Sequence, residues 1–237
     1  MMMPEGPEVR GLVQRMDARF SGGRYEVTAA SILSGRYKKA SGPRSGLAPE
    51  NWDALQAALP LVLHSIRCKG KFIWFELGKA RCGGGDDGGV NSNVESGSDD
   101  EQARGSLTCW STLGMTGGWT LRKDPRHARI ALHIRSRAIN DSNASSETLY
   151  FCDMRNFGTF KVVLDHAALE AKLKALGPAW LPDPLAPRGG DGLDLNTFVS
   201  IGLASAKRAP TRPLAVFLMD QSKTSGIGNY ILSEVGA

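Results

Sequence analysis

The residue types best suited to chemistry stand at the start of the chain, where Pro4, Glu5, Pro7 and Glu8 crowd together. An α-amino nitrogen has a pKa of about 7.7 to 8.0, so a proline at a free amino terminus keeps a neutral, nucleophilic fraction at neutral pH. Such an amine can attack C1′ of a nucleotide, release the base and leave an iminium that drives elimination of the flanking phosphates. The pattern permits covalent catalysis on a nucleotide, provided that Met3 is the true or processed start.

The same residues also have a purely structural interpretation. Pro7 lies near the first position of an expected helix, and Glu8 lies in its first turn, where the helix dipole favours a carboxylate. If Met1–Met3 stay attached, the Pro4 nitrogen is an amide and cannot attack anything. The opening segment therefore predicts either an amino-terminal nucleophile or residues that only mark the start of a helix.

The composition favours a polyanionic partner. The formal net charge is +5, and phosphates that are neutralised by basic side chains release counterions and so promote binding. Charge alone indicates DNA or RNA only weakly, because many basic proteins bind neither. Lys207, Arg208 and Arg212 add positive charge near the carboxyl end, although each could equally belong to a solvated basic face.

The four cysteines, Cys68, Cys82, Cys109 and Cys152, are widely spread, with no C-x-x-C pair and no nearby histidine pair. This spacing predicts no metal site and is typical of free thiols in a reducing compartment, most of them small core residues. The start lacks the features of a secretory signal or transit peptide, and the longest apolar stretch, residues 55–66, is too short to span a membrane. We expect a protein of the nucleus, or of the cytoplasm if the source is prokaryotic.

A framework of helices and strands must position these residues. Apolar residues from Val9 to Phe20 follow helical spacing, and Gly22 and Gly23 end the pattern. Short runs of β-branched and aromatic residues, separated by Gly, Pro, Ser and Asp, predict a mostly antiparallel sheet. These runs are 25–33, 61–67, 71–77, 107–121, 129–135 and 148–163.

The remaining segments differ in character. Residues 79–106 are rich in glycine and acidic residues and predict a disordered acidic insertion, most simply a solvated loop without function. Asp165 caps an expected helix that Gly177 and Pro178 close. Residues 179–194 have the composition of an interdomain linker. Helical patterns follow at 195–204, at 214–220 and from Asn229 onward, after the turn Ser225–Gly228.

The segment Pro4–Glu8 resembles the opening of the Fpg/Nei family, the formamidopyrimidine-DNA glycosylases and endonucleases VIII. Four further segments match in the same order along the chain. They are Gly70–Leu77, Leu113–Gly117, Asp153–Gly158, and Leu218–Gln221 continued through Gly226–Tyr230. Five colinear matches are far more specific than one, and they are most similar to the viral and vertebrate Nei-like branch.

The resemblance implies an α+β fold in which an amino-terminal helix packs on a two-layer, mainly antiparallel β-sandwich. A helical domain with a helix-two-turn-helix element follows, and DNA lies in the cleft between the two. The implied parts are a catalytic domain at 1–178, a linker at 179–194 and an incomplete helix-two-turn-helix domain at 195–237. The zinc finger of the family, or its metal-free equivalent, is missing, so the chain is expected to be a fragment or a truncated gene product.

The resemblance also implies catalytic roles. Pro4 would be the nucleophile, and Glu5 the general acid and base that protonates the sugar ring oxygen and shuttles protons during elimination. Glu8 would fix the geometry of the first helix and the amine, or serve the helix alone. Lys71 would project a cation from a rigid strand to a phosphate or sugar, where the alternative is a solvated edge residue.

The residues implied to contact DNA form two groups. Met115, Arg155 and Phe157 would fill the gap left when the damaged nucleotide is everted, with core packing as the alternative for each. The second group belongs to a turn and helix start whose backbone N–H groups would hold a phosphate, and it comprises Gly226, Gly228 and Asn229.

The implied function is that of a bifunctional enzyme, an N-glycosylase and abasic-site lyase that acts on oxidised bases in double-stranded DNA. The Gly6 variant of the opening and the strand at Lys71 favour oxidised pyrimidines or hydantoins. We expect a monomer that needs no cofactor and no membrane. The alternatives are a DNA-binding protein without catalysis, disabled by a blocked terminus or by truncation, and a basic β-rich structural protein with no DNA role.

Overall fold

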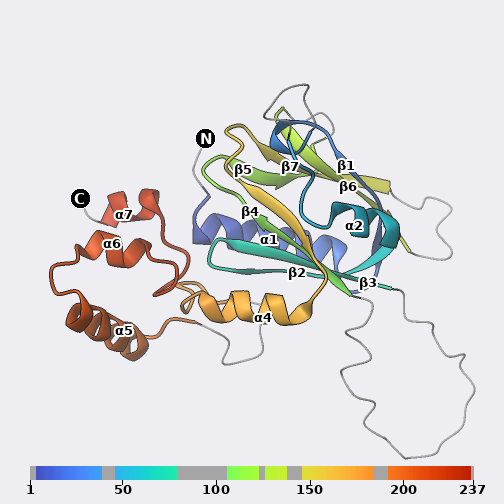
Figure 1. Ribbon diagram of the computed structural model, residues 1–237. Coiled ribbons are helices and arrows are strands. Elements are labelled where there is room, and N and C mark those ends of the chain that lie inside the picture. The colour runs from blue at the N-terminus through green and yellow to red at the C-terminus, as the bar shows by residue number, and fades with distance from the viewer. Residues whose placement is uncertain are drawn as a thin grey trace, which may run out of the picture.

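The computed structural model describes residues 4–38, 46–79, 106–122, 126–137, 146–183 and 192–235 (Figure 1). The strands are β1 (Tyr25–Ile32), β2 (Leu61–Lys69), β3 (Phe72–Gly78), β4 (Leu107–Thr112), β5 (Gly117–Thr120), β6 (Ala128–Ser136), β7 (Ser146–Asp153) and β8 (Thr159–Val163). The helices are α1 (Gly6–Phe20), α2 (Trp52–Ala58), α4 (His166–Ala175), α5 (Leu195–Arg208), α6 (Leu214–Met219) and α7 (Asn229–Val235), with a short 3-10 helix, η1 (Gly35–Tyr37). Residues 80–105 of the predicted insertion lie outside the described residues.

The strands form an antiparallel sheet, in the order β5-β7-β6-β1-β2-β3-β4-β8, that curls over itself. Trp119 on β5 and Phe160 on β8 come from opposite ends of this order, yet their ring centroids lie 6.0 Å apart. The Trp119 ring also lies 5.0 Å from that of Phe75 on β3, and all three side chains are buried. These contacts confirm the α+β class, with a two-layer, mainly antiparallel β-sandwich behind an amino-terminal helix.

Two of the predicted β-rich ranges each contain two strands. Residues 107–121 contain β4 and β5, and the turn between them includes Gly114 at a φ of +58°. Residues 148–163 contain most of β7 and all of β8, and the loop between them includes Asn156, also at +58°. A residue with a left-handed backbone interrupts the alternation of a strand, so each of these ranges forms two strands and the connection between them.

Helix α1 carries the predicted apolar face. Val9, Val13, Met16 and Phe20 recur at helical spacing, and none is more than 5% exposed. Burial of each such side chain stabilises the fold by about 1.5 to 3 kcal/mol relative to exposure. The helix packs on β2, and this contact fixes residues 4–8 at one end of the sandwich.

A hydrogen bond between α1 and β2 allows a test of this packing. The Asp17 Oδ1 atom accepts a hydrogen bond from the Ile66 backbone N–H at 2.7 Å, and Ile66 is fully buried. Asp17→Ala should lower the free energy of unfolding by about 1 to 3 kcal/mol, because the N–H group would lose its partner away from water. Urea denaturation measures the change, with Gln14→Ala on the exposed side of the same helix as the control. Equal stability of the two variants would contradict this role of Asp17.

The carboxyl-terminal half begins with the predicted α4. The Asp165 side chain accepts a hydrogen bond from the Ala167 N–H at 2.9 Å, which confirms the predicted cap. Leu169 is buried against the outer face of the sheet, in a cluster with Phe72 and Trp110. Helix α4 therefore packs on the sandwich, and the chain then continues to helices α5, α6 and α7.

Helices α5, α6 and α7 lie together on one side of the sandwich (Figure 1). An aromatic row packs α5 against its neighbours, with ring centroids 5.4 Å apart for Trp180 and Phe198 and 6.1 Å apart for Phe198 and Phe217. Asp194 caps α5 and accepts a hydrogen bond from the Thr197 N–H at 2.9 Å. The bonds from Thr197 lower the pKa of this carboxyl. The helical pattern predicted over 195–204 continues to Arg208.

The described cysteines are free thiols, of which Cys68 and Cys109 are buried and Cys152 is half-buried. Burial raises the pKa of both Cys68 and Cys109 to about 12, which makes them unreactive core residues. Cys82 lies outside the described residues. Within the described ranges, no three His, Cys, Asp or Glu side chains are grouped to hold a metal ion. No helix among those described has the length and apolar character to cross a bilayer.

Candidate active site

Three segments that are distant in the sequence meet at the amino end of α1. The Gly6 backbone N–H donates a hydrogen bond to the Gly226 carbonyl at 2.9 Å. Gly70, in the turn between β2 and β3, has a φ of +59°, and a Cβ atom there would lie 2.8 Å from the Gly226 nitrogen. Glycine permits both the conformation and the close approach. The opening of the chain, the β2–β3 turn and the turn before α7 therefore form one site.

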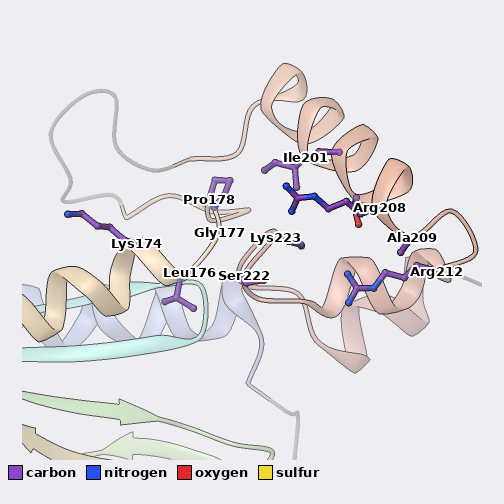
Figure 2. Close-up of a pocket in the computed structure, with 12 residues that line it drawn as sticks. Lys174, Leu176, Gly177, Pro178, Ile201, Arg208, Ala209, Arg212, Ser222 and Lys223 are labelled. Carbon is purple, nitrogen blue, oxygen red and sulfur yellow. The ribbon is translucent and has the colours of Figure 1, made fainter.

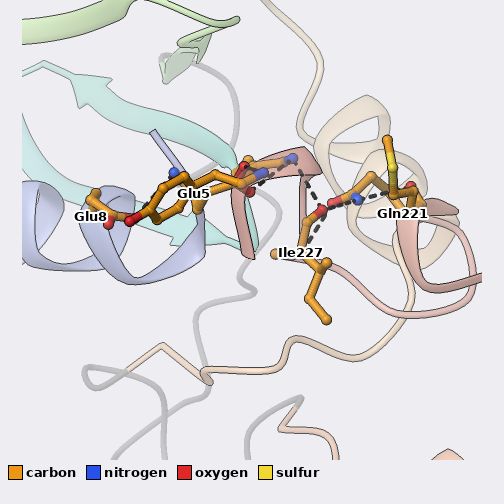
Figure 3. A network of polar contacts seen from close by, with 8 residues as sticks. Glu5, Glu8, Gln221 and Ile227 are labelled. Atoms are coloured by element: carbon orange, nitrogen blue, oxygen red, sulfur yellow. Dashed lines mark hydrogen bonds and ion pairs between the residues drawn. The ribbon is translucent and has the colours of Figure 1, made fainter. Parts of the chain in front are cut away.

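Glu5 lies at the centre of this site, with only 2% of its surface exposed. Its Oε1 atom accepts a hydrogen bond from the Tyr230 backbone N–H at 3.2 Å, and its Oε2 atom lies 3.5 Å from the Lys71 Nζ atom. Its own backbone N–H donates to Glu8 Oε2 at 3.2 Å (Figure 3). A buried carboxylate requires such partners, so Glu5 is held in one orientation directly after Pro4, which is half-buried.

Lys71 is held by the turn that precedes α7. Its Nζ atom donates to the Ile227 carbonyl at 3.1 Å, while its side chain keeps 33% of its surface exposed. Gln221 donates to the same carbonyl at 2.8 Å and accepts from the Gly226 N–H at 3.0 Å (Figure 3). The ammonium of Lys71 is thus held by the turn, while the side chain as a whole stays partly exposed to solvent.

The turn that was predicted to bind a phosphate packs against this ion pair. Gly226 and Gly228 are buried, and Asn229, the first residue of α7, is exposed. A Cβ atom at Gly228 would collide with both carboxylate oxygens of Glu5 and would lie 2.5 Å from the Lys71 Nζ atom. The turn therefore closes one side of the site, and its contact with a phosphate stays a prediction.

Two residues of the site received no role from the sequence. Gln221 and Tyr230 fall inside the matched segments, but nothing in their side-chain types assigned them to Glu5 or Lys71. An amide five residues before a glycine is a weak signal for a braced turn, since amide side chains bond to many partners. Tyr230 contributes its backbone N–H. Nearly every residue type has this group, so the sequence cannot indicate the contact.

The predicted wedge residues stand on two loops. Met115 lies in the turn between β4 and β5, and Arg155 and Phe157 lie in the loop between β7 and β8. The Arg155 Nη1 atom is 3.8 Å from the Met115 Sδ atom, and a Cβ atom at Gly114 would lie 3.0 Å from the Phe157 Cβ. Phe157 is 58% exposed and Arg155 is also exposed. Core packing is therefore excluded for these two, whereas Met115, which lies beside them, is half-buried.

A cleft of about 450 Å³ lies elsewhere, between the end of α4, helix α5 and the segment at Ser222 and Lys223 (Figure 2). Its other basic lining residues are Lys174, Arg208 and Arg212. None of the predicted catalytic or DNA-contacting residues lines it. The positive charge noted at Arg208 and Arg212 thus faces a cleft that is separate from the network around Glu5.

Comparison with known proteins shows the family of the chain. The family model described as the formamidopyrimidine-DNA glycosylase N-terminal domain matches residues 3–160. The chain belongs to this family. The matched range of the glycosylase domain contains α1, the sandwich through the start of β8, and the predicted catalytic residues Pro4, Glu5 and Lys71. The family membership inferred from the five motifs is confirmed, and placement in the Nei-like branch stays a prediction.

Individual members of the glycosylase family align over nearly the whole chain. A formamidopyrimidine-DNA glycosylase of Listeria innocua is 22% identical, and the alignment covers 98% of this chain and 66% of the relative. A MutM structure with DNA that contains carbocyclic 8-oxo-G has a TM-score of 0.60 at 19% identity, covering 98% of this chain and 67% of that one. Lactococcus lactis Fpg, bound to DNA with an abasic site, has a TM-score of 0.58 at 19% identity, with the same coverage. The chain thus shares their fold and spans about two thirds of their length.

Proposed function

We propose that this chain is a bifunctional DNA glycosylase and abasic-site lyase of base-excision repair, with Pro4 as the nucleophile. The observation that carries the proposal is the buried Glu5 carboxylate, which directly follows Pro4 and is oriented by Lys71 and the Tyr230 N–H group. A secondary amine beside a fixed carboxylic acid supplies both a nucleophile and a proton donor. The substrate would be damaged double-stranded DNA, and the chemistry needs no cofactor.

In the proposed reaction, the neutral Pro4 nitrogen attacks C1′ of the damaged nucleotide. The bond from C1′ to the base breaks, the amine proton leaves with the base, and Glu5 protonates the ring oxygen so that the sugar opens to an iminium. The ionised Glu5 then takes the C2′ proton, and the iminium accepts the C2′–H electrons to give an enamine. Return of these electrons forms a C2′=C3′ double bond as the C3′–O bond breaks. The flanking phosphate departs, and water later releases Pro4. No oxidant or reductant is consumed.

The DNA would be held by residues around this centre. Lys71 would bind a phosphate or sugar oxygen, because its side chain is partly exposed and its ammonium lies beside Glu5. The surface group of Met115, Arg155 and Phe157 would fill the space left by the everted nucleotide. A backbone phosphate would be held by Gly226, Gly228 and Asn229.

The substrate class is supported by what the relatives bind. The MutM structure contains DNA with an 8-oxo-G analogue, and the Lactococcus lactis structure contains DNA with an abasic site. Oxidised bases and abasic sites are thus the proposed substrates of this chain. Within that class we propose a preference for oxidised pyrimidines or hydantoins, which rests on the Gly6 opening and the strand at Lys71.

The same proposal assigns regions of the chain to tasks. Residues 1–178 would form the catalytic domain, residues 179–194 the linker, and residues 195–237 the helix-two-turn-helix part that binds DNA. The protein would act as a monomer on nuclear DNA, or in the cytoplasm of a prokaryote.

Borohydride trapping tests the proposed chemistry. A chain whose first residue is Pro4 should form a covalent adduct with abasic-site DNA, since borohydride reduces an iminium to a stable amine. A chain that retains Met1–Met3 should form none, because its Pro4 nitrogen is an amide. Fluorescence anisotropy with the same DNA controls for binding by both preparations, and mass spectrometry verifies each terminus. No adduct from a Pro4-terminated chain that binds DNA would overturn the lyase and favour a DNA-binding protein without catalysis.

A further inference from the structure

One buried carboxylate connects the two loops that carry Met115, Arg155 and Phe157. Asp153 is the last residue of β7 and is only 1% exposed. Its Oδ1 atom accepts a hydrogen bond from the Thr116 hydroxyl at 2.7 Å, and Thr116 directly follows Met115. Asp153 therefore reaches across from its own loop to the turn between β4 and β5.

The same carboxylate also shapes the loop between β7 and β8. Its Oδ1 atom accepts from the Arg155 N–H at 3.2 Å, and its Oδ2 atom accepts from the Gly158 N–H at 2.6 Å. The Arg155 N–H also lies 3.1 Å from the Thr116 hydroxyl oxygen, which closes a triangle between the two loops. These bonds bracket Phe157, so its backbone is held at both ends.

Arg129 supports this arrangement from the neighbouring strand β6. Its Nε atom donates to the Asp153 carbonyl at 2.7 Å, and its Nη2 atom donates to the Met154 carbonyl at 3.4 Å. Its third anchor is the Ser34 hydroxyl, 2.8 Å from Nη1. With 9% of its surface exposed, Arg129 brings a positive charge close to Asp153 and helps to retain that buried carboxylate.

We propose that Asp153 is a positioning residue that locks the two loops into one unit, so that the side chains of Met115, Arg155 and Phe157 enter the duplex together. The inference rests on the proposed function, because it concerns the step in which a nucleotide is everted. Insertion of side chains into a base stack costs unstacking energy. A loose loop would lose conformational freedom on entry in addition, whereas a loop that is already ordered would not. Asp153 would act before the chemistry and would touch neither Pro4 nor Glu5.

Asp153→Asn keeps the size of the side chain but replaces one acceptor oxygen by a donor, so either the Arg155 N–H or the Gly158 N–H loses its acceptor on this side chain. Excision of an oxidised base from duplex DNA should slow by about tenfold to a hundredfold in single-turnover assays. Borohydride trapping on an abasic site in single-stranded DNA should remain at the wild-type rate, because no base stack has to be opened there. Asp165→Asn is the matched control, since asparagine caps a helix as well as aspartate does.

A spectroscopic measurement reports the insertion itself. With 2-aminopurine opposite an abasic site, binding of the wild-type protein should raise the fluorescence as the wedge residues disturb the stack. Asp153→Asn should reduce this rise, as should Thr116→Val, which removes only the link between the loops and leaves the bond to Gly158 in place. The second variant keeps the test decisive if the first does not fold.

The outcomes separate this inference from the proposed function. An unchanged fluorescence rise in folded variants, or an equal slowing on duplex and single-stranded DNA, would overturn the role of Asp153. If the wild-type chain traps no DNA at all, the lyase proposal fails, whereas the fluorescence measurement still decides whether Asp153 positions the wedge.

Discussion

Replacing Glu5 by glutamine should slow base excision by about 10²- to 10⁴-fold in single-turnover assays, the range that a general acid and base contributes. Glutamine has nearly the same shape, and its carbonyl oxygen can still accept the Tyr230 N–H bond that Glu5 Oε1 accepts at 3.2 Å. It cannot protonate the sugar ring oxygen or take a proton from C2′. The loss should therefore appear in the chemical step, and the affinity for duplex DNA, measured by anisotropy, should persist.

A matched substitution separates this effect from a general loss of structure. Glu76 on β3 accepts a hydrogen bond from the Trp74 indole N–H at 3.1 Å, and glutamine can accept the same bond. Glu76→Gln should thus retain the wild-type rate. If Glu5→Gln also kept the wild-type rate while bound to DNA, the general acid would have to be another group, and the proposed mechanism would be wrong.

The sequence predicted elements best where a long pattern repeats. Helix α1 was evident because Val9 to Phe20 keep one apolar face over three turns and Gly22 and Gly23 end it at φ values of +78° and +75°. Helix α2 has seven residues, of which Trp52 and Leu55 are buried. Two buried positions do not establish a period, so this helix was not predicted.

The membership of the site could be predicted, but its contacts could not. The five matched segments contain Glu5 and Lys71, yet the two side chains are 66 positions apart and no periodicity brings them within 3.5 Å. The Tyr230 N–H that binds Glu5 comes from the other end of the chain. Asp153 is the first residue of a matched segment, but its role could not be predicted from the sequence. Its hydrogen bond with Thr116 depends on how two separate turns fold.

Substitution of Gly228 by alanine should reduce base excision by about a hundredfold, the loss expected when a catalytic group is displaced by roughly 1 Å. The new methyl group would collide with both Glu5 carboxylate oxygens and would lie 2.5 Å from the Lys71 Nζ atom. These atoms are the far ends of flexible side chains, so the carboxylate and the ammonium should move while the backbone stays in place. The melting temperature should therefore remain near the wild-type value even though the ion pair is disturbed.

Gly202→Ala is the control for this substitution, because a Cβ atom at Gly202 in α5 would meet no atom within 4 Å. Alanine in a helix interior is favoured over glycine by up to about 1 kcal/mol, so this variant should be at least as stable as the wild type and fully active. Loss of excision by Gly228→Ala with a preserved melting temperature would show that close packing of the turn on Glu5 and Lys71 sustains the chemistry. Full activity of Gly228→Ala would mean that the contact is dispensable. In that case, the bonds of Glu5 to the Tyr230 N–H and to the Lys71 ammonium would be enough to orient it.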